Sequence, residues 1–377
     1  MKVNACIVTF PLSEAGYAPL SNLVKLFSRL VNRVCVVSGG AALENLRLDS
    51  NVKAMKVTHR VSPKLVMRII NYVHTQLKIL NCVIEASPGT DLFAFSVGGQ
   101  DLILPVLALK LLRKKVLLLP GGTATREYSS VRRDPLPKFR SLLNGLNFSL
   151  ADNIILYSRT MIREANLAKY HHKIIIAHEH FVDFSKFSIK KTIDERLNVV
   201  GYIGRLSEEK GILNLIDAML LMLEKKTQIH FMICGDGSLA DKVGKTIIDD
   251  GLEAITKLTK WIPHDDVPRY LNELKLLVLP SFAEGLPNIL LEAMACGTPV
   301  LAAPIGAIPD IIRDGEIGFL LKSNDPKHIA DKIVELLNKP EFLEKVSKNA
   351  YEWVRENFSE EKTLESWRRI LQELETQ

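Results

Sequence analysis

Apolar and polar positions along the chain follow two alternating patterns. Short continuous apolar runs, each ending near a glycine, proline or serine, are separated by segments whose apolar residues recur with the helical period, such as Leu20–Leu30 and Leu102–Leu112. Buried strands that alternate with helices predict parallel α/β units, because parallel strands need a long crossover connection.

The strand-like runs form two sets on either side of a charged stretch, FSIKKTIDER, at residues 187–196. The first set is 3–10, 33–39, 92–98, 115–122 and 153–158, and the second is 197–205, 229–237, 274–281, 298–304 and 317–321. We therefore predict an α/β protein with two facing Rossmann-like, doubly wound domains and a cleft between them.

The charged stretch is interpreted as the linker. The predicted domains are residues 1–187 and 188–358, followed by residues 359–377 as a C-terminal amphipathic helix. One face of that helix carries Leu364, Trp367, Leu371 and Leu374.

Length and composition agree with a two-domain protein of the cytoplasm. The 377 residues exceed what one core usually fills, and the five cysteines are scattered singly without a CxxC pair. The first apolar run is too short for a signal peptide, and none approaches the roughly 18 apolar residues of a membrane span. We expect a soluble protein, or one held at the inner face of a membrane.

Charge is distributed unevenly between the two halves. Residues 1–190 hold 26 Lys/Arg and 12 Asp/Glu, a balance of +14, while the remainder holds 23 and 31, a balance of −8. Nine cations lie between Lys110 and Arg140, where only Glu127 and Asp134 oppose them. Residues 110–140 are either a solvated surface or a contact for anionic lipid. No nucleic-acid motif accompanies them, so we expect no nucleic-acid partner.

The most informative stretch is PSFAEGLPNILLEAMACGTPV, residues 280–300. It follows a predicted strand and opens a helix, with Pro287 suited to the first turn and Gly297 to the C-terminal stop. Free amides at such a helix start, here near Gly285 and Leu286, form an anion site. Two carboxylates, Glu284 and Glu292, flank it and are natural acceptors for sugar hydroxyls.

Two cations in GYIGRLSEEKG, Arg205 and Lys210, follow the first strand of the same domain. Their loop should therefore open on the same edge of the sheet as Glu284. A planar guanidinium and a compact ammonium together suit a diphosphate. The combined pattern predicts a site for a nucleotide-diphosphate sugar.

These stretches resemble the retaining GT-B glycosyltransferases called family 4, or glycosyl transferases group 1. The motifs are GRLSEEKG (204–211), CGDGSL (234–239), residues 278–321 and VDFSKF (182–187). The resemblance is specific over residues 182–321 and looser before them, where LADNIILYS (150–158) is its clearest part.

The resemblance implies a role for each matching residue. Arg205 and Lys210 would stabilise the leaving diphosphate, Glu284 would hold the donor sugar and Glu292 the ribose. It implies retention of configuration without a metal, and the sequence has no DxD triplet. It also implies that the C-terminal helix, residues 359–377, crosses back to the N-terminal domain. The catalytic set is Arg205, Lys210 and Glu284. The predicted donor-binding set is Gly16, Gly204, Arg205, Lys210, Glu284, Gly285, Leu286, Pro287 and Glu292. We expect no cofactor beyond the nucleotide sugar.

The activity implied is hexosyl transfer to a hydroxyl acceptor, such as a lipid-linked or cell-envelope glycan. Two alternatives stay open: a nucleotide-sugar 2-epimerase, and a catalytically degenerate binding protein. The second is kept because LLLPGGTATREY (117–128) has glycines where the family carries a histidine.

Two further patterns, a glycine-rich stretch and a group of histidines, are weaker. CGDGSLA (234–240) formally fits a dinucleotide fingerprint, but an acidic ribose partner is not evident. His171, His172, His178 and His180 lie close together without the spacing of a metal site. We interpret His178 or His180 as lining the acceptor site.

Overall fold

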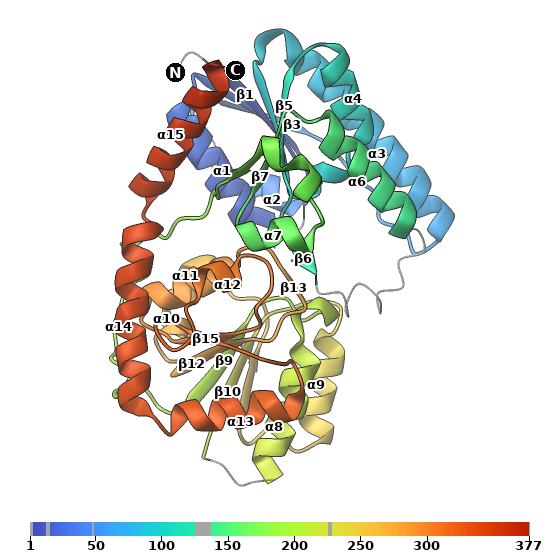
Figure 1. The fold of residues 1–377 in the computed structure, drawn as a ribbon. Helices are drawn as coiled ribbons and strands as arrows, with labels where there is room; N and C mark the ends of the chain where they lie inside the picture. Colours follow the sequence, from blue (N-terminus) through green and yellow to red (C-terminus); the bar gives the residue numbers. More distant parts are fainter. Residues whose placement is uncertain (1–2, 13–15, 47–48, 125–136, 225–227, 377) are drawn as a thin grey trace. The chain divides into compact units, whose positions relative to one another are not determined.

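The computed structural model describes residues 3–12, 16–46, 49–124, 137–224 and 228–376. They form two compact units (Figure 1). The N-terminal unit contains the described residues of 1–121, 133–180 and 363–377, and the C-terminal unit those of 122–132 and 181–362. The predicted boundaries at 187/188 and 358/359 lie a few residues from these divisions.

The N-terminal unit is built on a seven-stranded sheet in the order β3-β2-β1-β4-β5-β7-β8, with every neighbouring pair parallel. Helices α1 and α15 cover one face, and α3, α4 and α6 cover the other (Figure 1). The strands are β1 (Asn4–Val8), β2 (Arg33–Ser38), β3 (Val52–Lys56), β4 (Leu92–Ser96), β5 (Lys115–Leu119), β7 (Asn153–Leu156) and β8 (Ile174–Ile176). The helices are α1 (Tyr17–Leu30), α2 (Ala41–Glu44), α3 (Leu65–Ala86), α4 (Ile103–Leu111), α6 (Pro137–Leu150), α7 (Arg159–Glu164) and α15 (Glu360–Thr376).

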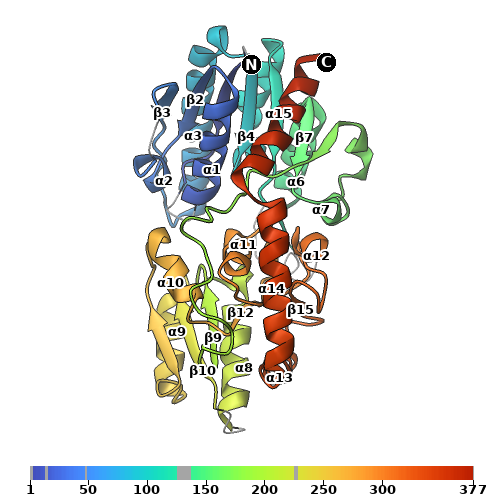
Figure 2. The same cartoon turned by 90° about the vertical axis from the view of Figure 1, so that its left-hand side faces the viewer.

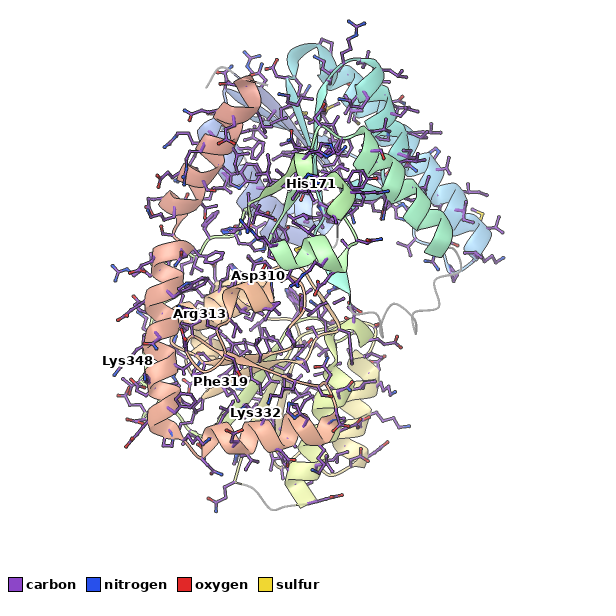
Figure 3. The ribbon with its side chains drawn as sticks, viewed as in Figure 1. His171, Asp310, Arg313, Phe319, Lys332 and Lys348 are labelled. Carbon is purple, nitrogen blue, oxygen red and sulfur yellow. The ribbon has the colours of Figure 1, made fainter. Side chains whose placement is uncertain are left out.

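The C-terminal unit has a six-stranded parallel sheet in the order β11-β10-β9-β12-β14-β15, together with the short antiparallel pair β13-β6. Phe319 of β15, labelled in Figure 3, is buried in the core of this unit against Phe342. The strands are β9 (Val199–Ile203), β10 (His230–Cys234), β11 (Thr256–Thr259), β12 (Leu276–Leu279), β14 (Val300–Ala302), β15 (Phe319–Leu320), β13 (Ala283–Glu284) and β6 (Thr123–Ala124). The helices are α8 (Ile212–Glu224), α9 (Ala240–Asp249), α10 (Val267–Leu271), α11 (Asn288–Ala295), α12 (Ile308–Ile311), α13 (Pro326–Leu337) and α14 (Pro340–Asn357).

The C-terminal helix α15 is amphipathic, and residues 363–377 belong to the N-terminal unit. Trp367 is fully buried there, edge-on to Phe27 of α1 with ring centroids 5.3 Å apart. Its indole Nε1 donates to the His178 carbonyl at 2.8 Å, so both its apolar body and its polar atom are satisfied.

The charged segment 187–196, predicted as a linker, packs inside the C-terminal unit. Phe187 and Ile193 are buried, and so is Arg196. The Arg196 guanidinium donates to the carbonyls of Lys191, Leu274 and Cys296 and to the Thr298 hydroxyl. A buried guanidinium needs such partners, so its charge marks a structural anchor in this segment.

Candidate functional site

The candidate site lies at the central strands of the C-terminal sheet. β9 pairs with β10 on one side and with β12 on the other, so the connections diverge in opposite directions from the β9–β12 pair. At such a switch point the loops after the two strands leave a crevice beyond their carboxyl ends. Arg205 and Lys210 follow β9 and Glu284 follows β12. The fold therefore brings these two stretches to the same edge.

Lys210 and Glu284 are in direct contact. Lys210 Nζ lies 2.7 Å from Glu284 Oε1, and the side chains are only 18% and 8% exposed. Ser281 Oγ donates to the same carboxylate oxygen at 2.7 Å. An ion pair shielded from water interacts more strongly than a surface pair. These contacts hold the Glu284 carboxylate in position. Both are made by its Oε1 atom and neither by Oε2.

Arg205 has an acidic partner that sequence reasoning missed, Glu209. Arg205 Nη2 lies 3.0 Å from Glu209 Oε1, and Ser207 Oγ donates to that oxygen at 2.7 Å. Burial raises the pKa of Glu209, but the hydrogen bond from Ser207 and the charges of Arg205 and Lys210 outweigh it and leave that pKa below its usual value. Glu209 therefore stays charged, and the half-exposed Arg205 is held near the loop.

Glycines allow these loops to approach one another. Gly211 has φ +66°, and a Cβ there would lie 1.9 Å from the Pro280 carbonyl oxygen. A Cβ on Gly235 would likewise lie 1.9 Å from the Gly204 carbonyl oxygen. The two loops are joined where Leu206 N donates to the Asp236 carbonyl at 2.9 Å. The glycines of CGDGSLA thus have a packing role, because a side chain there would prevent this close approach.

The Glu284 loop is clamped by neighbouring backbone. Ala307 N donates to the Gly285 carbonyl at 2.8 Å, and Glu284 pairs with Thr123 in the β13-β6 ladder. Gly122 precedes that ladder, and a Cβ there would lie 2.9 Å from the backbone of Glu284 and Gly285. Leu286 is buried in this loop.

Helix α11 begins at Asn288, so Pro287 occupies the N-cap and not the first turn that the sequence predicted. The difference is one residue: the φ of −71° suits a helix, but the extended ψ of 123° places Pro287 before it. Gly297, at φ +66° just after the helix, ends it as predicted.

Glu292, on α11, contacts a histidine that the sequence analysis did not select. His264 Nε2 lies 2.7 Å from Glu292 Oε1, and the Phe187 ring packs beside the imidazole at 5.4 Å between centroids. The hydrogen bond to Glu292 raises the pKa of His264 against the opposing effect of burial. The imidazole is therefore biased towards its charged form, which pairs with the carboxylate.

Gly16 and the histidines lie in the N-terminal unit. Gly16 is the N-cap of α1, and its role in donor binding stays a prediction. His171, labelled in Figure 3, packs edge-on to His172. Burial, followed by the charge of His180, lowers the pKa of His178 to about 3, so this side chain is neutral in ordinary buffers. Among the described residues, no group of three or more His, Cys, Asp or Glu could hold a metal ion.

Several cations of the predicted surface at 110–140 form ion pairs or hydrogen bonds within the N-terminal unit. Lys110 pairs with Asp152 at 2.7 Å, Lys114 Nζ donates to the Thr90 carbonyl at 2.9 Å, and Lys115 Nζ donates to the Leu374 carbonyl. The side chains of Arg126, Arg132, Arg133, Lys138 and Arg140 lie outside the described residues. Within the described part of the chain, no helix is long and apolar enough to cross a membrane.

Comparison with protein families gives one match, the model described as glycosyl transferases group 1, over residues 183–353. This range contains Arg205, Lys210, Glu284 and Glu292. The chain carries a glycosyl transferases group 1 domain. The expected resemblance to glycosyl transferases group 1 is confirmed.

Curated proteins similar to this chain are glycosyltransferases. An uncharacterized glycosyltransferase of Methanocaldococcus jannaschii, MJ1178, is 27% identical over 84% of this chain and 85% of its own. A poly(ribitol-phosphate) alpha-N-acetylglucosaminyltransferase of Staphylococcus aureus is 34% identical over 45% of this chain and 34% of its own length.

Solved structures match nearly the whole chain in fold. Anabaena Alr3699/HepE, solved in complex with UDP and glucose, aligns with a TM-score of 0.77 and 18% identity, covering 97% of this chain and 99% of that one. At this identity the likeness concerns the fold alone. The predicted fold class, GT-B with two Rossmann-like parallel-sheet domains, is confirmed.

Proposed function

We propose that this protein transfers a sugar from a nucleotide-diphosphate sugar to a hydroxyl acceptor with retention of configuration. The observation that carries the proposal is the contact of Lys210 with Glu284 at the switch point, with Arg205 on the same loop as Lys210. Cations suited to a diphosphate and a carboxylate suited to sugar hydroxyls thus stand side by side.

In this proposal the donor exchanges partners with the existing ion pairs. Without ligand, Lys210 and Arg205 are paired with Glu284 and Glu209. When the donor binds, the two cations form ion pairs with its diphosphate instead. Glu284 then accepts hydrogen bonds from the donor sugar, while Ser281 keeps its carboxylate in place. Preorganised cations stabilise the negative charge that grows on the leaving diphosphate, which is the main contribution such a site can make.

Glu292 and His264 would hold the nucleoside end of the donor. A carboxylate is the natural acceptor for ribose hydroxyls, and His264 fixes one of its oxygens. We further propose that no metal takes part, because Arg205 and Lys210 already supply positive charge. The acceptor proposed is a lipid-linked or cell-envelope glycan, in line with the ribitol-phosphate polymer named for the Staphylococcus aureus relative.

The decisive experiment is calorimetric titration with UDP, GDP and ADP, each in EDTA. We expect one nucleotide to bind, and Arg205→Ala to weaken it by about tenfold or more, the effect of losing a charge-assisted contact. Arg313→Ala is the matched control, because Arg313 is an exposed cation of the same unit paired only at the surface with Glu316 (Figure 3). Equal binding by both variants would contradict the proposed phosphate site.

Product analysis with sugars of the nucleotide that binds distinguishes a transferase from the two alternatives, a 2-epimerase and a degenerate binding protein. A transferase releases free nucleoside diphosphate only when acceptor is added, whereas a 2-epimerase converts the donor without acceptor. A degenerate binding protein would bind the nucleotide and do neither.

A further inference from the structure

Exposed large apolar side chains gather at the start of α3 in the N-terminal unit. Val61, just before the helix, is 91% exposed, and Val66 is 67% exposed. Residues 63–70 are all exposed, so the first turns of the helix are open around their whole circumference. Contiguous exposed apolar surface of this kind is uncommon on soluble proteins and marks a contact site.

The apolar side chains lie on one stripe of the helix. Leu65, Ile69, Val73 and Leu77 recur at four-residue spacing, and Val66 and Ile70 lie beside them. All six are exposed. The stripe is therefore an unpartnered face about three turns long, or roughly 20 Å at 1.5 Å per residue.

The second half of α3 is anchored, so the open face is carried on a fixed element. Thr75, Ile79 and Val83 are buried, and the Tyr72 hydroxyl donates to the Asp101 carbonyl at 2.5 Å. Gln76 Oε1 accepts from Leu104 N at 3.1 Å, which ties α3 to the start of α4. Figure 1 shows α3 running alongside α4 within this unit, and Figure 2 shows α3 behind α1 and α2.

The sequence around this face is rich in cations, two of which, Lys53 and Lys56, pair with Glu85 and Glu44. Residues 50–84 contain six Lys/Arg and no Asp or Glu. Lys64 and Arg68 are exposed beside the apolar stripe, and no acidic group among the described residues pairs with either. A helix with an apolar stripe and a cationic flank has the composition of an element that lies in a membrane interface.

We propose that the first three turns of α3, together with Val61, dock the protein on an anionic lipid surface. The apolar stripe enters the boundary between headgroups and acyl chains, and Lys64 and Arg68 contact lipid phosphates. Each cation near such a surface contributes about 1 kcal/mol, and each buried apolar side chain adds to that. The charge argues against a second copy of this chain as the occupant, since two like-charged faces repel.

This inference moves the predicted lipid contact from residues 110–140 to α3. It goes beyond the proposed transferase activity, because a protein can bind lipid through the N-terminal unit whether or not the C-terminal unit binds a nucleotide. It also agrees with a lipid-linked acceptor without depending on one.

The test is flotation of the full-length protein with neutral phosphatidylcholine vesicles and with vesicles carrying about 30 mol% phosphatidylglycerol. We expect binding to the anionic vesicles only. Val66→Asp/Ile70→Asp and, separately, Lys64→Glu/Arg68→Glu should each lower the partition coefficient by about tenfold or more. Lys345→Glu/Arg355→Glu on α14 makes the same charge change at an exposed surface of the other unit and should bind as the unmodified protein does.

A second variant keeps the surface apolar and reports on insertion directly. Val66→Trp should gain a blue-shifted fluorescence component with anionic vesicles, while Leu111→Trp, at an exposed position ending α4, should not. Failure of the unmodified protein to bind anionic vesicles would overturn the proposal. So would equal binding by Val66→Asp/Ile70→Asp, or a dimer in solution that this variant converts to monomer. Nucleotide titration of every variant, expected to be unchanged, separates these outcomes from failure of the proposed function.

Discussion

At the scale of single residues, the candidate site consists of charged side chains and the groups that pair with them. Arg205, Lys210, Glu284 and Glu292 were selected from sequence because their types and loop positions suit a nucleotide sugar. Each is engaged in the folded protein by an oppositely charged or titratable group. In the proposed function, a donor must therefore replace these existing contacts.

The partners could not be predicted equally well. Glu209 lies four residues after Arg205 in the same loop, so its pairing was within reach of local reasoning. His264 and Glu292 are 28 residues apart and meet only because the loop after β11 passes beside α11. Sequence spacing carries no information on such a contact.

The His264–Glu292 pair predicts a pH dependence of stability. Because the folded-state pKa of His264 is raised above the ordinary 6.5, the folded protein binds more protons than the unfolded chain in this range. The stabilisation is complete below the unfolded pKa and is lost as pH rises through the folded value. The His264 side chain is about half exposed, so solvent screens the pair and the loss between about pH 6 and pH 8.5 should be below about 1 kcal/mol.

Urea unfolding at both pH values measures this change. In His264→Gln the contribution should vanish, whereas His230→Gln, at an exposed histidine of β10, should keep it. If both variants show the same pH dependence, the Glu292 contact is not its source.

At the scale of elements, the strands flanked on both sides by neighbours were predicted correctly, whereas the edge strands β3, β8 and β11 were not named. β1, β4, β5, β9 and β12 are flanked on both sides and have apolar sequences. β3 and β11, VKAMK and TKLT, have no fully buried position and resemble polar connections, while β8 is apolar but only three residues long. β6 and β13 have two residues each, too few to carry a periodic signal.

The β6-β13 ladder predicts a role for Gly122. Gly122→Ala would bring a Cβ within 2.9 Å of the backbone of Glu284 and Gly285, so that loop must shift. We expect kcat/KM for the donor to fall by about tenfold, since small displacements of a binding carboxylate are costly. Steady-state kinetics with the identified donor measures it. Gly121→Ala meets no atom within 4 Å and serves as the control; equal losses in both variants would rule out the contact as the cause.

At the scale of the whole molecule, the sequence predicts two α/β domains, and two parallel sheets are present. Strand order within each sheet could not be derived, because it depends on which crossover each helix takes. The C-terminal helix was predicted from its apolar face. Its contacts with Phe27 and with His178 join residues more than a hundred positions apart.

This long-range closure predicts that Trp367 stabilises the N-terminal unit. Trp367→Ala removes a fully buried side chain and leaves the His178 carbonyl without its indole donor, at a cost of about 3–5 kcal/mol. Urea unfolding should show the loss, while nucleotide titration, which reports on the C-terminal unit, should change little. Trp261→Ala provides the comparison, because that side chain is 43% exposed and should cost far less. Similar losses for the two would contradict a closing role for α15.

The return of residues 363–377 to the N-terminal unit has a consequence for protein engineering. Neither unit is encoded by one uninterrupted stretch. A chimaera that joins this C-terminal unit to a relative's N-terminal unit at a single splice point would therefore pair a foreign sheet with this chain's terminal helix. A functional hybrid needs a second junction near residue 362, so that the helix is inherited together with the sheet it covers.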